Sequence, residues 1–106
     1  MSRGTPRAPA TGDALIGIWQ LLRCDSPLEI EPGTRMHFTA PDQLEYIIPA
    51  AGGALRVSLR WRVESGVLHT AHEDGSNAVR VPVELRPEGI LMCDFGGPRA
   101  LFVQVV

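Results

Sequence analysis

The stretch "ALRVSLRWRVE", residues 54–64, alternates apolar and polar side chains from its second residue to its last. Successive side chains of an extended strand point to opposite faces, so this spacing collects the apolar residues on one face. A helix turns once in about 3.6 residues and would scatter the same side chains around its surface. The stretch therefore predicts a β-strand with one buried face. The buried side chains would be Leu55, Val57, Leu59, Trp61 and Val63.

The same period of two recurs along most of the chain. Turn signals rich in Gly, Pro, Asp and Ser separate the runs at spacings of about 8–14 residues. Eight strands joined largely by short hairpins are typical of an antiparallel barrel or sandwich, so we predict an all-β fold. The "TGDALIG" stretch (residues 11–17) fits one helical turn, with Thr11 or Asp13 as its cap. The expected strands cover residues 17–24, 35–40, 43–48, 54–64, 67–73, 78–86, 90–95 and 100–106.

A two-residue turn at Ser65-Gly66 sets the register of one hairpin. It places Trp61 opposite Thr70, and it turns His72 toward the interior.

A second hairpin contains a three-residue Pro-Glu-Gly turn that ends at Gly89. With Gly89 in a left-handed conformation, Leu85 pairs with Leu91, and Cys93 and Phe95 point inward. The opposite register would bury Asp94 without an evident partner, which is unfavourable.

Length and charge limit the classes of function. The chain has 106 residues, 44% of them apolar, which suits one domain. We expect a disordered tail over residues 1–13 and a single β-barrel domain over residues 14–106. A formal net charge of −2 favours neither nucleic acid nor an anionic membrane as a partner. The first residues contain no apolar signal segment and no run is long enough to span a membrane, so we expect a cytoplasmic protein.

Cys24 and Cys93 are expected to be reduced core thiols. The cysteines and histidines do not have the spacing of a metal site, and no phosphate loop or nucleophile motif occurs. We therefore predict neither a metal nor a cofactor.

The start of the first expected strand, "LIGIWQLL" (residues 15–22), resembles the Gly-x-Trp opening of lipocalin-like (calycin) barrels, in particular the short bacterial lipocalin-like domains. The "EIEPGTRMHFTAPDQLEYII" stretch (residues 29–48) follows the same outline, with a Pro-Gly loop before a strand. The resemblance implies an eight-stranded antiparallel barrel, short and either closed or incompletely closed. It also implies that Gly17 permits a tight approach of the chain and that Trp19 plugs the closed end. Family members often place a basic residue over this tryptophan, where the present chain has Gln104.

Three functions remain open at this point. The leading hypothesis is a non-enzymatic protein that holds a small apolar or amphipathic molecule in a shallow barrel, as the resemblance implies. The second is a homodimeric interaction module with a filled core and no ligand, which uses the last strand, apolar on both faces, together with an outer arginine face. The third is an enzyme in which His72 and Tyr46 perform acid–base chemistry. The candidate ligand-binding residues are Met36, Phe38, Tyr46, Leu59, Trp61, Thr70, His72 and Phe95.

An outer face carries Arg56, Arg60 and Arg62, with Arg80 on a neighbouring strand. Two interpretations fit this face. It binds an acidic partner or a phosphate, or it is a solvated face that neighbouring glutamates neutralise.

Overall fold

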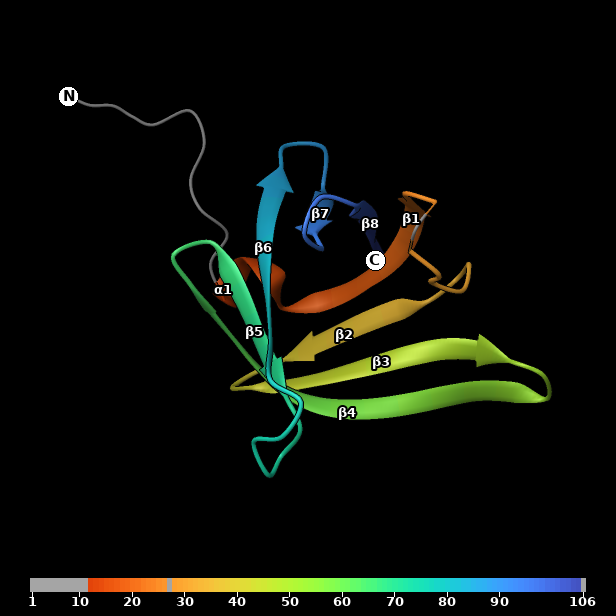
Figure 1. Ribbon diagram of the computed structural model, residues 1–106, viewed down its shortest axis with the longest axis horizontal. Helices are drawn as coiled ribbons and strands as arrows, with labels where there is room; N and C mark the ends of the chain where they lie inside the picture. Colours follow the sequence, from red (N-terminus) through yellow and green to blue (C-terminus); the bar gives the residue numbers. More distant parts are fainter. Residues whose placement is uncertain (1–11, 27, 106) are drawn as a thin grey trace.

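The computed structural model describes residues 12–26 and 28–105, and it contains a closed barrel of eight antiparallel strands (Figure 1). Each strand pairs with the next along the chain, and the last pairs with the first. The predicted all-β fold is therefore confirmed, and of the two closures left open the barrel adopts the complete one. Its elements are α1 Gly12–Leu15, β1 Gly17–Cys24, β2 Arg35–Thr39, β3 Gln43–Ala50, β4 Gly53–Glu64, β5 Val67–Ala71, β6 Val79–Arg86, β7 Ile90–Asp94 and β8 Arg99–Val105.

The predicted tail overlaps the start of the described chain. Residues 1–11 of that tail lie outside the described residues, and so does the candidate cap Thr11. Gly12 and Asp13 already belong to α1, which is the single helical turn expected from "TGDALIG".

Both predicted hairpin registers are confirmed. Ser65 and Gly66 have φ values of 51° and 77°, which is the left-handed pair that a two-residue hairpin turn requires. As a result Trp61 pairs with Thr70. Gly89 has a φ of 77° and allows Leu85 to pair with Leu91.

Both apolar faces of the last strand are at least half-buried in the structure. Ala100 and Phe102 of β8 point into the barrel and are buried, whereas Leu101 and Val103 lie on the outer face and are half-buried. Backbone pairing of β8 with both β7 and β1 closes the sheet.

A register shift interrupts the pairing of β1 with β8. The shift lies between Leu21, which pairs with Phe102, and Arg23, which pairs with Leu101. Leu22 is the extra residue and is 53% exposed. The shift sets Arg23 beside Leu101 on the outside of the barrel, where both contribute to a groove described below.

The connections alternate between the two ends of the barrel because consecutive strands run in opposite directions. The short β2–β3, β4–β5 and β6–β7 turns lie at one end together with α1, and we call this the closed end. The β3–β4, β5–β6 and β7–β8 connections lie at the other, which we call the open end. In Figure 1, β3 and β4 extend well beyond their neighbours on the open-end side. The expectation that Leu55 is buried is wrong, because Leu55 lies near the start of β4, beside the β3–β4 turn, and is 57% exposed.

Trp19 closes the barrel at the end where α1 lies. Its side chain is 1% exposed, and its Nε1 donates a hydrogen bond of 2.9 Å to the carbonyl oxygen of Leu15 in α1. Leu15 is itself fully buried. The indole and the helical turn therefore hold one another in place.

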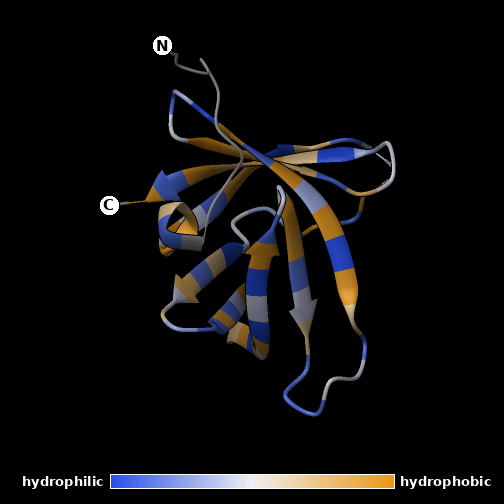
Figure 2. Ribbon diagram, turned by 90° about the vertical axis from the view of Figure 1, so that its left-hand side faces the viewer, coloured by the Kyte–Doolittle hydropathy of each residue, from blue (hydrophilic) through white to orange (hydrophobic). Residues whose placement is uncertain are grey.

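Side chains of opposite hydropathy alternate along the strands, as the banding in Figure 2 shows. The inward members form a single buried cluster inside the barrel. This cluster consists of Leu15, Trp19, Met36, Phe38, Leu44, Trp61, Leu68, Val81, Val83, Leu91, Cys93, Ala100 and Phe102.

Gly17→Ala is expected to destabilise the protein more than Gly53→Ala. Both glycines have a positive φ, +135° and +148°, so an alanine strains the backbone at either position, by about 1–3 kcal/mol. Only at Gly17 would the added Cβ also approach another side chain, the Nε2 of Gln104 at 3.2 Å. Urea unfolding of both variants measures the difference. Gly17→Ala/Gln104→Ala should recover the additional stability that Gly17→Ala loses. Equal losses of stability in Gly17→Ala and Gly53→Ala would contradict the close approach.

Candidate ligand-binding cavity

The open half of the barrel contains a cavity of about 310 Å3. Its wall comes from β2 through β7 and from the loops at the open end, and most of its side chains are apolar. The lining residues are Met36, Tyr46, Ile48, Val57, Leu59, Leu68, Thr70, His72, Asn77, Val79, Val81, Cys93 and Phe95.

The depth of the cavity can be followed along β5 and the loop after it. Leu68 is 2% exposed, Thr70 is 8% exposed and His72 is half-buried, so successive inward positions rise from the floor to the mouth. The mouth also includes Val79, 47% exposed, and Phe95, 39% exposed. The alternation that predicted these inward positions therefore gives the cavity its walls.

Six of the eight candidate ligand-binding residues line this cavity. They come from β2 to β5, from the β5–β6 loop and from the residue after β7, which are distant in sequence. The six are Met36, Tyr46, Leu59, Thr70, His72 and Phe95.

The structure does not bring the other two candidates, Phe38 and Trp61, to the cavity. Their rings pack edge to face, with centroids 4.9 Å apart and planes 75° apart. Trp61 Nε1 donates a hydrogen bond of 3.2 Å to the carbonyl oxygen of Thr39, next to the β2–β3 turn at the closed end. Both side chains point inward as expected, but they belong to the filled part of the interior and do not line the cavity.

Tyr46 places a hydroxyl group in the cavity wall without a protein partner. Among the described residues, no hydrogen bond to its Oη is present. Burial, and to a smaller extent the nearby Cys93 thiol, raise the pKa of Tyr46 from 10.0 to about 12. The phenol is therefore neutral at physiological pH and is available as a hydrogen-bond donor.

Cys93 and Thr70 supply the other polar atoms deep in the cavity. Burial raises the pKa of the Cys93 thiol from 9.0 to about 12, so it is a neutral thiol and a poor nucleophile at physiological pH. The Thr70 hydroxyl has no hydrogen-bond partner among the described residues, although this residue is 8% exposed. Cys24, the other cysteine, is half-buried, and both thiols are free.

His72 stands at the mouth, where a tight loop follows it. Its backbone N–H donates to the carbonyl oxygen of Ser76 at 3.0 Å, and its own carbonyl accepts from Gly75 N at 2.8 Å. Within this loop, hydrogen bonds from Ser76 to the Asp74 carboxylate lower the pKa of Asp74. The loop thus sets the position of the His72 imidazole from its backbone.

Several lining residues were absent from the candidate set. Val57 and Ile48 could have been found from strand alternation. Val57 lies on the predicted inward face of residues 54–64, and Ile48 lies two residues after Tyr46 and so shares its face. Asn77 could not have been found in this way, because it lies in a loop with a φ of 53° and belongs to no alternating run.

The described residues contain no group of three or more His, Cys, Asp or Glu side chains able to hold a metal ion. No helix in that part of the chain is both long enough and apolar enough to cross a membrane. Comparisons of the chain with protein-family models, with curated proteins and with solved structures return no match. The chemistry of the cavity itself must therefore indicate what it accepts.

Tyr46 is expected to ionise near pH 12 in the folded protein and near pH 10 when the protein is unfolded in urea. It is the only tyrosine of the chain, so the ultraviolet absorbance of phenolate reports it without interference. A native midpoint near pH 10 would show that the hydroxyl is hydrated and not buried in the cavity wall.

The raised pKa values of Tyr46 and Cys93 predict a loss of stability at alkaline pH. An acid whose pKa is raised by folding stabilises the native state below its unfolded pKa, and this contribution is lost as the pH rises through the folded pKa. The free energy of unfolding should therefore fall from about pH 9 for Cys93 and from about pH 10 for Tyr46, until about pH 12. Each group contributes up to about 1.4 kcal/mol per pH unit. In Tyr46→Phe the part due to the phenol should disappear and the part due to Cys93 should remain.

Proposed function

We propose that the protein binds a small, uncharged and largely apolar molecule in the open half of the barrel, in the manner of a lipocalin-like carrier. The observation that carries this proposal is the cavity of about 310 Å3 beneath an exposed mouth. Small-molecule pockets measure roughly 300–1,000 Å3, so the cavity suits a ligand at the lower end of that range.

The lining favours a neutral ligand. It contains no Lys, Arg, Asp or Glu side chain, and two of its titratable groups, Tyr46 and Cys93, are neutral at physiological pH. An ion that entered this space would lose most of its hydration without gaining an opposite charge, which is strongly unfavourable. Apolar surface would instead be buried against the aliphatic side chains of the floor and walls.

One hydrogen-bonding group on the ligand would complete the site. The hydroxyl groups of Tyr46 and Thr70 have no partner among the described residues, and both line the cavity. A ligand with an acceptor atom, such as a ketone or an ether, would accept a hydrogen bond from one of these hydroxyl groups, which contributes about 0.5–1.5 kcal/mol net. Tyr46 and Thr70 are therefore the proposed polar anchors.

The closed end is consistent with membership of the lipocalin-like (calycin) family. Trp19 is buried there against α1, and Gly17 allows Gln104 to approach the backbone at the start of β1. These features support the roles proposed for the Gly-x-Trp opening, and family membership remains part of this proposal.

The enzyme alternative is less well supported by the lining. A tyrosine whose pKa is raised to about 12 is a weaker acid than a free tyrosine, and it is not ionised to act as a base near neutral pH. His72→Ala would lower the turnover of any reaction that depends on this imidazole. The homodimeric module stays a prediction, for which sedimentation at high protein concentration is the measurement.

Val79→Trp is expected to weaken the binding of a medium-chain methyl ketone and of indole by at least about tenfold, because the larger side chain obstructs the mouth. Val79 is 47% exposed, so the substitution is tolerated by the fold. The matched control is Leu55→Trp, since Leu55 is 57% exposed and outside the lining. Isothermal titration calorimetry and native mass spectrometry on the full chain measure both variants.

Tyr46→Phe separates the polar anchor from the apolar cavity. This variant should bind the ketone more weakly and should bind an alkane-like probe of the same length as tightly as the wild-type protein does. If neither probe binds the wild-type protein, or if Leu55→Trp weakens binding as much as Val79→Trp does, the cavity is not a ligand site.

A further inference from the structure

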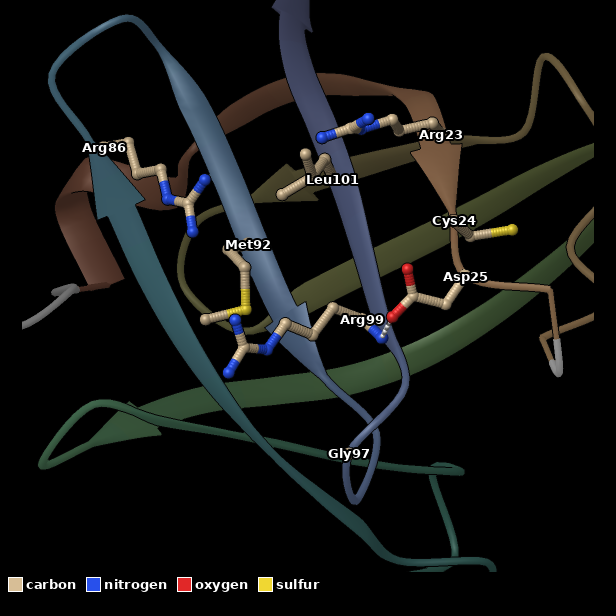
Figure 3. Close-up of a pocket in the computed structure, with 8 residues that line it drawn as sticks. All are labelled: Arg23, Cys24, Asp25, Arg86, Met92, Gly97, Arg99 and Leu101. Carbon is tan, nitrogen blue, oxygen red and sulfur yellow. Dashed lines mark hydrogen bonds between the residues drawn. The ribbon is translucent and has the colours of Figure 1, made fainter.

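A second hollow, of about 450 Å3, lies on the outer surface of the barrel over β1, β6, β7 and β8 (Figure 3). We call it the outer groove. It shares no residue with the cavity inside the barrel. The lining residues are Arg23, Cys24, Asp25, Arg86, Met92, Gly97, Arg99 and Leu101.

The floor of the outer groove is apolar. Met92 of β7 pairs with Leu101 of β8, and both side chains are half-buried on the outer face. Three arginines stand around this floor. In Figure 3, Arg86 and Arg99 extend on either side of Met92, and Arg23 lies across Leu101.

Most other described arginines on the barrel have a side-chain acceptor. Arg56, Arg60 and Arg62 of the predicted arginine face contact the carboxylates of Glu45, Asp42 and Glu64, so the second interpretation of that face applies to them. Arg35 donates instead to the side-chain amide oxygen of Gln20.

The outer groove is different. Among the described residues, the side chains of Arg23 and Arg99 have no hydrogen-bond or ion-pair partner. Arg86 contacts Glu84 at 3.6 Å, which is longer than a good charge-assisted hydrogen bond. Guanidinium groups without a strong partner thus gather beside the half-buried apolar side chains of the floor.

The one carboxylate of the lining is already engaged. Asp25 Oδ2 accepts a hydrogen bond of 2.8 Å from the backbone N–H of Arg99, and Asp25 N donates to the Arg99 carbonyl at 2.9 Å. These bonds tie the end of β1 to the start of β8. As Figure 3 shows, they hold the carboxylate at the backbone of Arg99, while the guanidinium group extends away toward Met92.

We propose that the outer groove binds an organic oxyanion, a phosphate monoester or a carboxylate, that carries a short apolar chain. The head lies between the guanidinium groups of Arg86 and Arg99, with Arg23 at its flank, because guanidinium matches the geometry of these oxyanions. The apolar chain lies along Met92 and Leu101, which it removes from water. The volume of the groove is within the range of small-molecule sites.

A second copy of the chain is a poorer occupant of the groove. A symmetric dimer across this face would bring arginines of one copy toward arginines of the other, and like charges at close range repel. Nucleic acid is also disfavoured, because the chain has a net charge of −2.

The test uses hexyl phosphate as the probe, with the full chain, at constant ionic strength and by isothermal titration calorimetry. Hexyl phosphate should bind at least tenfold more tightly than inorganic phosphate and than hexanol. Hexanoate in place of hexyl phosphate tells which head is preferred. Binding of inorganic phosphate as tight as that of hexyl phosphate would remove the role of Met92 and Leu101. Equally tight binding of hexanol would remove the role of the arginines.

Variants then locate the site. The double variant Arg23→Gln/Arg99→Gln should bind hexyl phosphate at least tenfold more weakly than the wild-type protein does. Arg80→Gln is the matched control, because Arg80 is exposed, lies outside the groove and has no side-chain partner among the described residues. An equal effect of the control would mean non-specific attraction, and it would overturn the proposal. Circular dichroism and thermal unfolding show that each variant is folded.

The proposal stands apart from the internal cavity, and one variant separates them. Val79→Trp obstructs the mouth of the cavity and should leave the binding of hexyl phosphate unchanged. If Val79→Trp abolishes this binding, the probe enters the barrel and the outer groove is not its site. If sedimentation shows a dimer that hexyl phosphate does not dissociate and that Arg23→Gln/Arg99→Gln leaves intact, the outer face belongs to a second copy.

Discussion

Trp19 fixes the closed end of the barrel through the hydrogen bond from its Nε1 to the carbonyl oxygen of Leu15, 2.9 Å long and buried. A helix of four residues such as α1 is too short to be stable alone, and a buried indole N–H without a partner would be unfavourable. Each therefore depends on the other. Gly17 lies between them with a φ of +135°, which lets the chain turn from α1 into β1 in a conformation that other residues rarely adopt. Since β1 pairs with both β2 and β8, this one contact orients the strand on which the closure of the whole sheet depends.

The interior of the barrel is filled in one part and hollow in another. Phe38 and Trp61 pack edge to face and belong, with Trp19, to the buried cluster that fills it. The cavity is lined by inward side chains of mixed size, from Tyr46 and Met36 to Thr70. Eight strands enclose an interior that side chains can just fill or that holds one small ligand. Both situations occur in this barrel, because a packed cluster and a cavity share its interior.

The amino-acid sequence was sufficient to predict the strands and, except for the last strand, which is apolar on both faces, the direction of their side chains, because alternation and turn chemistry are local properties. The positive φ values of Ser65 and Gly89 are examples in which the turn alone determined the pairing. Depth along the barrel axis was not predictable in the same way. Phe38 and Trp61 were assigned correctly to the inward face, but their distance from the open end depends on the registers of all eight strands together. The outer groove was missed for a related reason, since its lining brings Arg23 of β1 beside Leu101 of β8, the two strands farthest apart in sequence, across a register shift at Leu22.

The outer groove and the internal cavity are lined by opposite faces of the same strand, β7. Along β7, Met92 belongs to the outer groove and its neighbour Cys93 belongs to the internal cavity. Because side chains alternate across the sheet, a slip of one residue would exchange these two and would turn β7 inside out. The outer side would then lose Met92 from beneath its guanidinium groups, and the inner side would turn Asp94, which now accepts hydrogen bonds from the N–H groups of Gly96 and Gly97, toward an uncharged space. An unpaired carboxylate is far more costly there than a cysteine thiol. The separation of a neutral interior from a cationic exterior is therefore itself a constraint that holds β7 in register.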